Sequence, residues 1–144
     1  MGERREYCTF YLGTNLFGVE VKRVQEVLKY QTMTRVPLAP DIVQGLINLR
    51  GQIVVAIDLR RRLKMPPRAK ERLPMNVVLR TGEGAASLLV DEIGDVVELD
   101  SDAFEPPPQT LQGSIREVIQ GAYKMKNQLL LVLDAAHAIR SPAE

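Results

Sequence analysis

The sequence predicts a mostly β fold, and three observations carry this prediction. Short runs rich in Val, Ile and Leu recur along the chain, Gly- and Pro-containing turns separate them, and only two short stretches have helical spacing. About nine or ten short strands with two short helices are typical of a barrel or a sandwich. The 144 residues, 45% hydrophobic and 26% charged, suit a single domain over 1–144 with a sizeable core.

The N-terminal part begins with two strands. Residues 7–12 alternate between two faces, and a turn at 13–15 leads to a second alternating run at 17–21. The charged segment 1–6 precedes this pattern, and we expect it to be flexible.

A short helix is predicted after the second strand. Val21, Val24 and Leu28 are spaced i, i+3, i+7, which is typical of the apolar face of an amphipathic helix over 21–29. Val24 then lies on the apolar stripe, and Glu26 lies on the wetter side.

Two apolar strands are predicted within 45–59, after a proline-containing loop at 36–41. They meet at Arg50 and Gly51, where glycine permits a positive φ. Because both runs are largely apolar, we expect these strands to be buried on two sides.

Charge is segregated in the second half of the chain. Residues 60–72 contain seven basic residues and two prolines, and residues 91–105 contain seven acids and no Lys or Arg. We interpret the first block as an exposed loop and the second as a solvated acidic face.

The remaining elements are also strands, followed by one helix. Asp134 is the predicted N-cap of a terminal helix over 135–140, and no internal repeat is visible. The predicted strands are 76–79, 85–90, 96–99, 118–123 and 129–133, with a hairpin turn at 82–84.

The composition argues against several classes of function. The formal net charge of +1 and the 5% aromatic content argue against a nucleic-acid partner. No apolar stretch of the sequence approaches the length that a membrane-spanning helix needs, so we expect no direct membrane insertion. The single cysteine allows no intrachain disulfide and suits a reducing, cytoplasmic location.

Residues for catalysis are not evident. His137 is the only histidine, which argues against Ser-His and Cys-His enzymes, and no pattern predicts a cofactor or a metal site. A carboxylate pair of Asp58 and Asp91 stays possible but nothing in the sequence requires it. These absences favour a protein that binds other proteins.

Several segments resemble the CheW chemotaxis coupling proteins. They are residues 17–21 and 24–27, Val36-Pro37, the run from Gly45 to Val54, residues 57–60, residues 88–93 with Val96, and residues 129–133. The resemblance covers residues 7–140. Val55 and Ser87 depart from the residues that many relatives have there.

The resemblance implies a fold and partners. It implies two SH3-like five-stranded β-barrels packed side by side and intertwined, with a C-terminal helix. It also implies a non-catalytic adaptor without cofactors, which links the cytoplasmic tips of methyl-accepting chemoreceptors to the regulatory domain of a CheA-type histidine kinase.

Four residues match positions that the family implicates in contacts. Gly45 and Arg50 match receptor-binding positions, and Val24 and Glu26 match a kinase or receptor interface. A backbone requirement explains Gly45 equally well, and core packing is the main duty expected of Val24. Turn chemistry does not demand arginine at position 50, so a contact role is favoured there.

Other functions stay open. The same fold serves adaptors of parallel pathways, such as twitching motility or surface sensing. A small-ligand-binding β-barrel regulator or a carboxylate-dependent hydrolase is a less favoured alternative.

Overall fold

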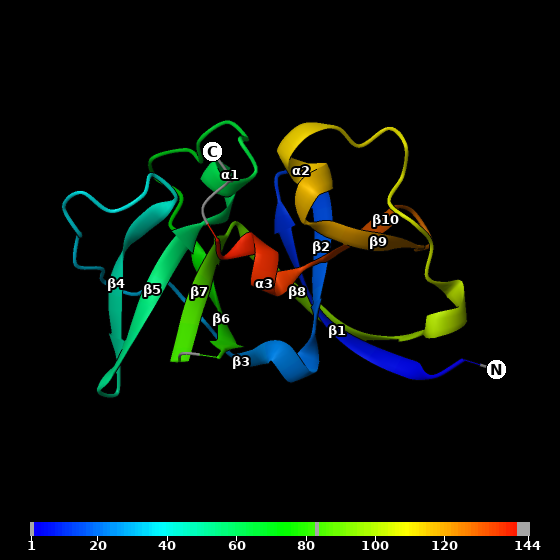
Figure 1. Ribbon diagram of the computed structural model, residues 1–144, viewed down its shortest axis with the longest axis horizontal. Helices are drawn as coiled ribbons and strands as arrows, with labels where there is room; N and C mark the ends of the chain where they lie inside the picture. Colours follow the sequence, from blue (N-terminus) through cyan, green and yellow to red (C-terminus); the bar gives the residue numbers. More distant parts are fainter. Residues whose placement is uncertain (1, 83, 141–144) are drawn as a thin grey trace.

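The computed structural model describes residues 2–82 and 84–140, and it confirms the mostly β fold. Two five-stranded sheets stand side by side, with the short helices at their junction and around their rims (Figure 1). We call them barrel A, with strand order β8-β1-β2-β10-β9, and barrel B, with order β3-β6-β7-β5-β4. The strands are β1 (Arg4–Leu12), β2 (Asn15–Glu20), β3 (Val24–Leu28), β4 (Val43–Leu49), β5 (Gln52–Asp58), β6 (Met75–Thr81), β7 (Gly84–Val90), β8 (Glu92–Asp100), β9 (Ile119–Lys124) and β10 (Leu129–Leu133).

The two barrels exchange strands. The β1–β2 hairpin belongs to barrel A, and the next strand, β3, crosses to barrel B. The β6–β7 hairpin belongs to barrel B, and β8 crosses back to barrel A. Neither barrel can therefore form from one continuous stretch of chain.

One isolated bridge closes each sheet into a barrel. Thr34 pairs with Leu46 of β4, and Glu105 pairs with Ala122 of β9, each through two backbone hydrogen bonds of 2.8 Å. Each bridge joins the segment that follows one edge strand to the opposite edge strand. The closed sheets agree with the SH3-like barrels that the resemblance implies.

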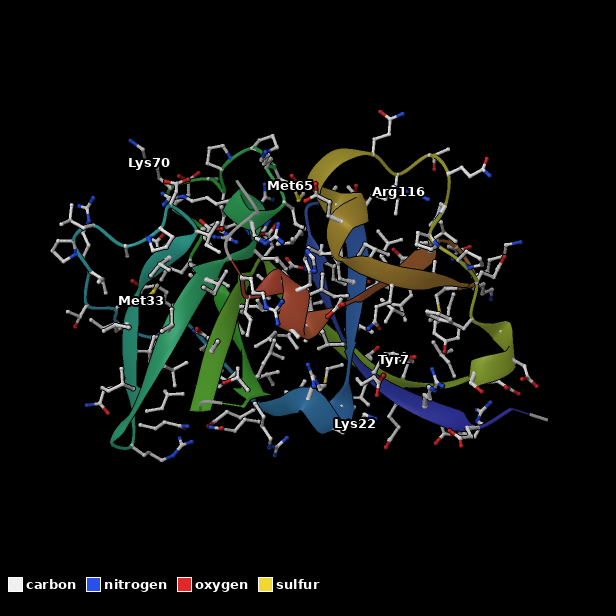
Figure 2. The ribbon with its side chains drawn as sticks, in the orientation of Figure 1. Tyr7, Lys22, Met33, Met65, Lys70 and Arg116 are labelled. Carbon is white, nitrogen blue, oxygen red and sulfur yellow. The ribbon has the colours of Figure 1, made fainter. Side chains whose placement is uncertain are left out.

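Three apolar clusters stabilise this arrangement. The largest lies between the barrels and contains the buried Phe10 and Leu88, and Met65 packs against it (Figure 2). Ile47 belongs to a smaller cluster of barrel B, and Tyr7 belongs to one of barrel A. The junction between the barrels is thus a core rather than a loose contact.

The two barrels repeat one pattern. Each has its single parallel pair at the same place, β2 with β10 and β7 with β5. The closing bridges align Ala122 with Leu46. The same offset aligns Asp134, the N-cap of α3 (Ala135–Ala138), with Asp58, the N-cap of α1 (Leu59–Arg62). Positions on these matched strands and N-caps therefore have counterparts in the other barrel, although no repeat is visible in the sequence.

The helix predicted over 21–29 is wrong beyond its first turn. Only Val21–Arg23 form a 3-10 helix, η1, and β3 starts directly afterwards at Val24. The register of β3 shifts between Val24 and Glu26, so the strand contains a β-bulge. A bulge interrupts the two-residue period of a strand, and the apolar spacing then imitates that of a helix.

Three other expectations need correction. Within the segment expected to be flexible, Arg4–Glu6 are the first residues of β1 and pair with β8, where Arg4 Nε lies 3.0 Å from Glu98 Oε1. Strands β4 and β5 are not buried on both faces, because Ile53 is 58% exposed. The helix α2 (Gly113–Val118) and the second 3-10 helix, η2 (Ser101–Ala103), were not predicted.

The C-terminal helix and the hairpin predicted around 82–84 are present. Asp134 caps α3 by accepting a hydrogen bond from the His137 N–H. Thr81 pairs with Gly84 across the β6–β7 turn, and Glu83 lies outside the described residues.

Candidate functional site

Two of the predicted site residues contact each other at the open end of barrel B. Glu26 lies on β3, and Arg50 lies at the tip of the β4–β5 hairpin. Arg50 Nη2 donates to Glu26 Oε2 in an ion pair. The two residues are 24 positions apart in the sequence, so only closure of the barrel brings them together.

The environments of the two charges differ. The Glu26 side chain is 23% exposed, whereas that of Arg50 is 69% exposed. The hydrogen bond from Arg50 lowers the pKa of Glu26, against a smaller opposing effect of burial. Glu26 is therefore an anion on a strand, not the exposed helical residue that the sequence predicted.

The backbone of Arg50 is left-handed. Its φ is +52°, and that of Gly51 is +89°, so both central residues of the two-residue turn have positive φ. Asn, Asp and Gly favour such positions, and arginine does not. The Gly51 N–H donates to Asn48 Oδ1 at 2.9 Å, which fixes the turn and hence the direction of the Arg50 side chain.

A chain of amides extends the ion pair. Gln25 Nε2 lies 3.0 Å from Gln52 Oε1 and 3.4 Å from Glu26 Oε2. The contact therefore joins β3 to the turn of the β4–β5 hairpin and to the start of β5. Sequence reasoning missed both glutamines, because their pairing depends on the β-bulge in β3.

Apolar side chains are exposed on the same strands as this polar chain. Val27 is 43% exposed and Ile53 is 58% exposed, and each follows a member of the polar chain by one strand position. Successive residues of a strand point to opposite faces, so the apolar pair lies on the face of the sheet opposite the polar chain. We call Glu26, Val27, Arg50 and Ile53 the hairpin surface.

The other two predicted residues have structural contacts. Gly45 is buried, and a Cβ there would lie 2.7 Å from the Thr34 carbonyl oxygen and 3.1 Å from Met33 Cβ. The close approach at the closing bridge therefore requires glycine. Val24 packs against the core between the barrels, as its apolar spacing indicated.

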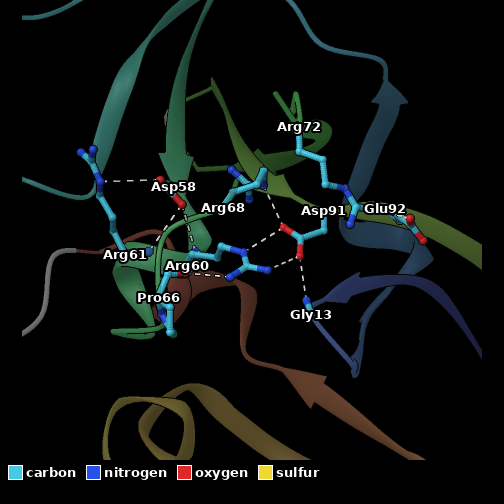
Figure 3. Close-up of polar contacts among 9 residues, drawn as sticks. All are labelled: Gly13, Asp58, Arg60, Arg61, Pro66, Arg68, Arg72, Asp91 and Glu92. Atoms are coloured by element: carbon cyan, nitrogen blue, oxygen red, sulfur yellow. Dashed lines mark hydrogen bonds and ion pairs between the residues drawn. The ribbon is translucent and has the colours of Figure 1, made fainter. Parts of the chain in front are cut away.

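A second polar cluster joins the barrels, and it corrects the interpretation of residues 60–72 as an exposed loop (Figure 3). Asp91 accepts hydrogen bonds from Arg60 Nε at 3.0 Å, Arg68 Nε at 2.8 Å and the Gly13 N–H at 2.7 Å. Asp91 is buried, and both arginine side chains are at most 15% exposed. We call these four residues the clamp.

The clamp holds Asp91 in its charged form. Burial alone would raise the pKa of Asp91, but the hydrogen bonds from Arg60, Gly13 and Arg68 outweigh it and hold the pKa well below the usual range. Arg72 also pairs with Glu92. Part of the basic block therefore neutralises the start of the acidic block.

The described residues show little that points to other chemistry. Within 2–82 and 84–140, no group of three His, Cys, Asp or Glu residues is placed to hold a metal ion. No helix in this part of the chain is long and apolar enough to cross a bilayer.

The fold and the hairpin surface define a small double-barrel domain with an exposed contact region. The comparisons agree, because the model of the CheW-like domain family matches residues 6–143. The chain belongs to the CheW-like family.

Individual relatives support this assignment. The chain is 28% identical over 137 residues to the chemotaxis protein CheW of Klebsiella aerogenes, covering 95% of this chain and 82% of that protein. It is 30% identical over 136 residues to the chemotaxis protein CheW of Treponema pallidum, covering 92% and 80%. The crystal structure of the scaffolding protein TtCheW from Thermoanaerobacter tengcongensis is similar with a TM-score of 0.81 and 27% identity, covering 91% and 89%.

Proposed function

We propose that this chain is a non-catalytic adaptor in chemotaxis signalling that couples the cytoplasmic tips of methyl-accepting chemoreceptors to a CheA-type histidine kinase. Its membership of the CheW-like family and the relatives named as chemotaxis proteins support the coupling role. The scaffolding function named for TtCheW supports the adaptor character. A role in the cytoplasm follows from these partners.

The observation that carries the proposal is the hairpin surface. Arg50 occupies a left-handed position that arginine does not favour, and its side chain stays 69% exposed. Only its Nη2 has a side-chain partner among the described residues. A guanidinium has five N–H donors in a fixed fork, so the remaining donors are available to carboxylates or carbonyls of a partner.

Glu26 orients this arginine. The ion pair and the left-handed turn hold the guanidinium over the end of the barrel, which reduces the entropy lost when a partner binds. Exposed Val27 and Ile53 supply apolar area on the other face of the same strands. Arginine is enriched at protein interfaces, and exposed apolar side chains supply contact area there.

Calorimetry with the regulatory domain of the cognate CheA-type kinase tests the contact. We expect micromolar affinity, about 8 kcal/mol, for the wild type. Arg50→Glu removes the donors and adds a charge that repels Glu26, so we expect a loss of about 2–5 kcal/mol if the contact is desolvated. Glu26→Lys should also weaken binding, because it repels Arg50 and releases it.

Two controls separate contact from folding. Lys70→Glu makes the same charge reversal on an exposed loop away from the hairpin and should leave the affinity unchanged. The double variant Glu26→Arg with Arg50→Glu restores the ion pair with its direction reversed. If Arg50 and Glu26 act only through their mutual contact, the double variant regains binding; if Arg50 contacts the partner, it does not.

Coupling requires a second assay. In a reconstituted mixture of receptor, kinase and this protein, Arg50→Glu should abolish receptor control of the kinase while circular dichroism shows an unchanged fold. Normal control of the kinase by this variant would contradict the assignment of Arg50. The neighbouring genes identify which receptors and which chemosensory pathway are cognate.

A further inference from the structure

A hollow lies between the barrels beside the C-terminal helix, on surface that the hairpin contact does not use. Its volume is about 590 Å³. Its walls come from η1, from the end of β6 and the turn after it, and from α3 with the residues that follow. We call it the α3 groove; it is lined by Lys22, Arg23, Leu79, Arg80, Thr81, Gly82, Ala135, Ala136, Ile139 and Arg140.

The α3 groove is cationic around an apolar floor. Among the described residues, four basic ones line it and no acidic one does, although the chain as a whole has nearly equal numbers of both. Arg80 is held by the carbonyl oxygens of Lys22 and Val24. The exposed side chains of Arg23 and Arg140 have no ion pair or hydrogen bond with any residue in the described ranges.

The repeat of the two barrels shows which residues occupy the position equivalent to the α3 groove. In the two parallel pairs, Phe17 of β2 occupies the same place as Ala86 of β7. Counting along the chain from this alignment makes Lys22 the counterpart of Asp91, and Gly82 the counterpart of Gly13. The offset of the N-caps makes Ala136 the counterpart of Arg60. The α3 groove is therefore the counterpart of the clamp.

Different side chains occupy the two equivalent positions, and this difference explains why the groove exists. In the clamp, Arg60 fills the space and Asp91 supplies a carboxylate between guanidinium groups. In the counterpart, a methyl group of Ala136 stands where a long side chain would be, and Lys22 replaces the carboxylate. Lys22 Nζ pairs with Glu20 Oε2 at 3.1 Å, and Glu20 does not line the groove. No described lining residue is an anion placed among the cations as Asp91 is placed in the clamp.

We propose that the α3 groove docks an acidic, amphipathic segment of a partner protein, with a carboxylate placed among Lys22, Arg23 and Arg140 as Asp91 is placed in the clamp. The apolar face of the segment covers Leu79 and Ile139. Such a segment contacts both barrels, since β6 belongs to barrel B and α3 follows the last strand of barrel A. This proposal stands apart from the hairpin contact and does not depend on it.

The lining favours a peptide over a nucleic acid. None of the described residues that line the groove is aromatic, so bases have no stacking platform there. The apolar floor, which includes Ala135 and Ile139, offers nothing to a phosphate backbone but suits the apolar stripe of a helix. The free cations at its edge then fix the register of the segment by pairing with its acids.

The test uses a defined probe with the full chain. A fluorescein-labelled amphipathic peptide of Glu, Ala and Leu, with Leu at i, i+3 and i+7, is titrated with the protein and followed by fluorescence anisotropy. We expect saturable binding that weakens as salt is raised. The same peptide with Lys in place of every Glu should not bind, and a single-stranded oligonucleotide of equal charge should not displace the acidic peptide.

Matched variants locate the binding. Arg23→Glu with Arg140→Glu should reduce the affinity by about tenfold or more, because each reversal removes an attraction and adds a repulsion. Lys70→Glu with Lys126→Glu changes the net charge equally on other surfaces, and it should bind as the wild type does. Figure 2 shows Lys70 and Lys22 at opposite edges of the molecule. The milder Arg23→Gln with Arg140→Gln keeps the test valid if the reversal disturbs folding.

The outcomes decide the proposal in each case. A loss confined to the two groove variants supports it. Equal loss in the control variant would show that the peptide responds to net charge alone, and the proposal would fail. It would also fail if the wild type did not bind the acidic peptide, or if the oligonucleotide displaced that peptide.

Discussion

The two junctions between the barrels have equivalent positions in the repeat and opposite character. One junction is filled by the clamp, in which buried Asp91 accepts hydrogen bonds from Arg60, Arg68 and Gly13. The other is the α3 groove, whose lining within 2–82 and 84–140 has four cations and no acid. One side of the pseudo-symmetric pair thus stabilises the double barrel, and the other is left free for contacts.

The two hairpin tips differ in a similar way. Lys126 on the β9–β10 hairpin is the counterpart of Arg50, yet its φ is not positive and it has no ion pair among the described residues. Arg50 has both features. The shared strand pattern therefore determines where a residue lies but not what it contacts. Variants at equivalent positions of the two barrels can separate effects on folding from effects on function.

The largest expected effect comes from opening the clamp. Asp91→Ala leaves the two guanidinium groups of Arg60 and Arg68 buried without their shared anion, so we expect a loss of about 3–5 kcal/mol in the free energy of unfolding. At the counterpart position, Lys22 is 78% exposed, and Lys22→Ala should cost less than about 0.5 kcal/mol. Urea denaturation of both variants measures the difference, and equal losses would contradict the assignment of the clamp.

The same comparison predicts a dependence on pH. Because the folded-state pKa of Asp91 lies below its unfolded value, the clamp contributes fully above about pH 5 and loses its contribution as pH falls further. The stability difference between wild type and Asp91→Asn should therefore be constant from pH 7 to about pH 5 and shrink at lower pH. Denaturation midpoints across this range test it; a difference that grows on acidification would be inconsistent with a depressed pKa.

Much of the fold was predictable because strand alternation survives in most elements. The alternation of residues 7–12 and the glycine turn after Arg50 correspond to β1 and the β4–β5 hairpin. Prediction failed at β3, where the bulge before Glu26 changes the apolar period. It also failed at residues 60–72, because the partner of Arg60 is 31 positions away and only the folded chain brings them together.

The candidate site was predictable only as separate residues. Glu26 and Arg50 were named through the family resemblance, but their ion pair depends on closure of barrel B at Thr34. Gly45 was named for two roles, and its buried position beneath that bridge supplies the structural one. The clamp and the α3 groove could not be predicted, since they emerge from a repeat that has no visible trace in the sequence.

A smaller effect is expected at the two closing bridges. A Cβ at Gly121 would lie 2.2 Å from Phe104 Cζ and 2.4 Å from the Glu105 carbonyl oxygen, whereas the nearest atom at Gly45 is 2.7 Å away. Both alanine variants force the bridge apart, at a cost of about 1–3 kcal/mol, and Gly121→Ala should lie at the upper end. Thermal unfolding ranks them, and a larger loss for Gly45→Ala would contradict the comparison.

The smallest effect is expected at the hairpin tips, and its sign is what matters. At Arg50 the φ of +52° is unfavourable for arginine, so Arg50→Gly relieves strain while it removes an exposed ion pair worth little. We expect a change within about 1 kcal/mol, neutral or stabilising. Lys126 has no such strain, so Lys126→Gly should destabilise by up to about 1 kcal/mol through the greater entropy of the unfolded chain. Denaturation curves give both signs, and calorimetry with the kinase domain gives the function. If Arg50→Gly retains the fold but loses kinase binding, arginine is present at this turn for the contact, whereas clear destabilisation would show that it serves the turn.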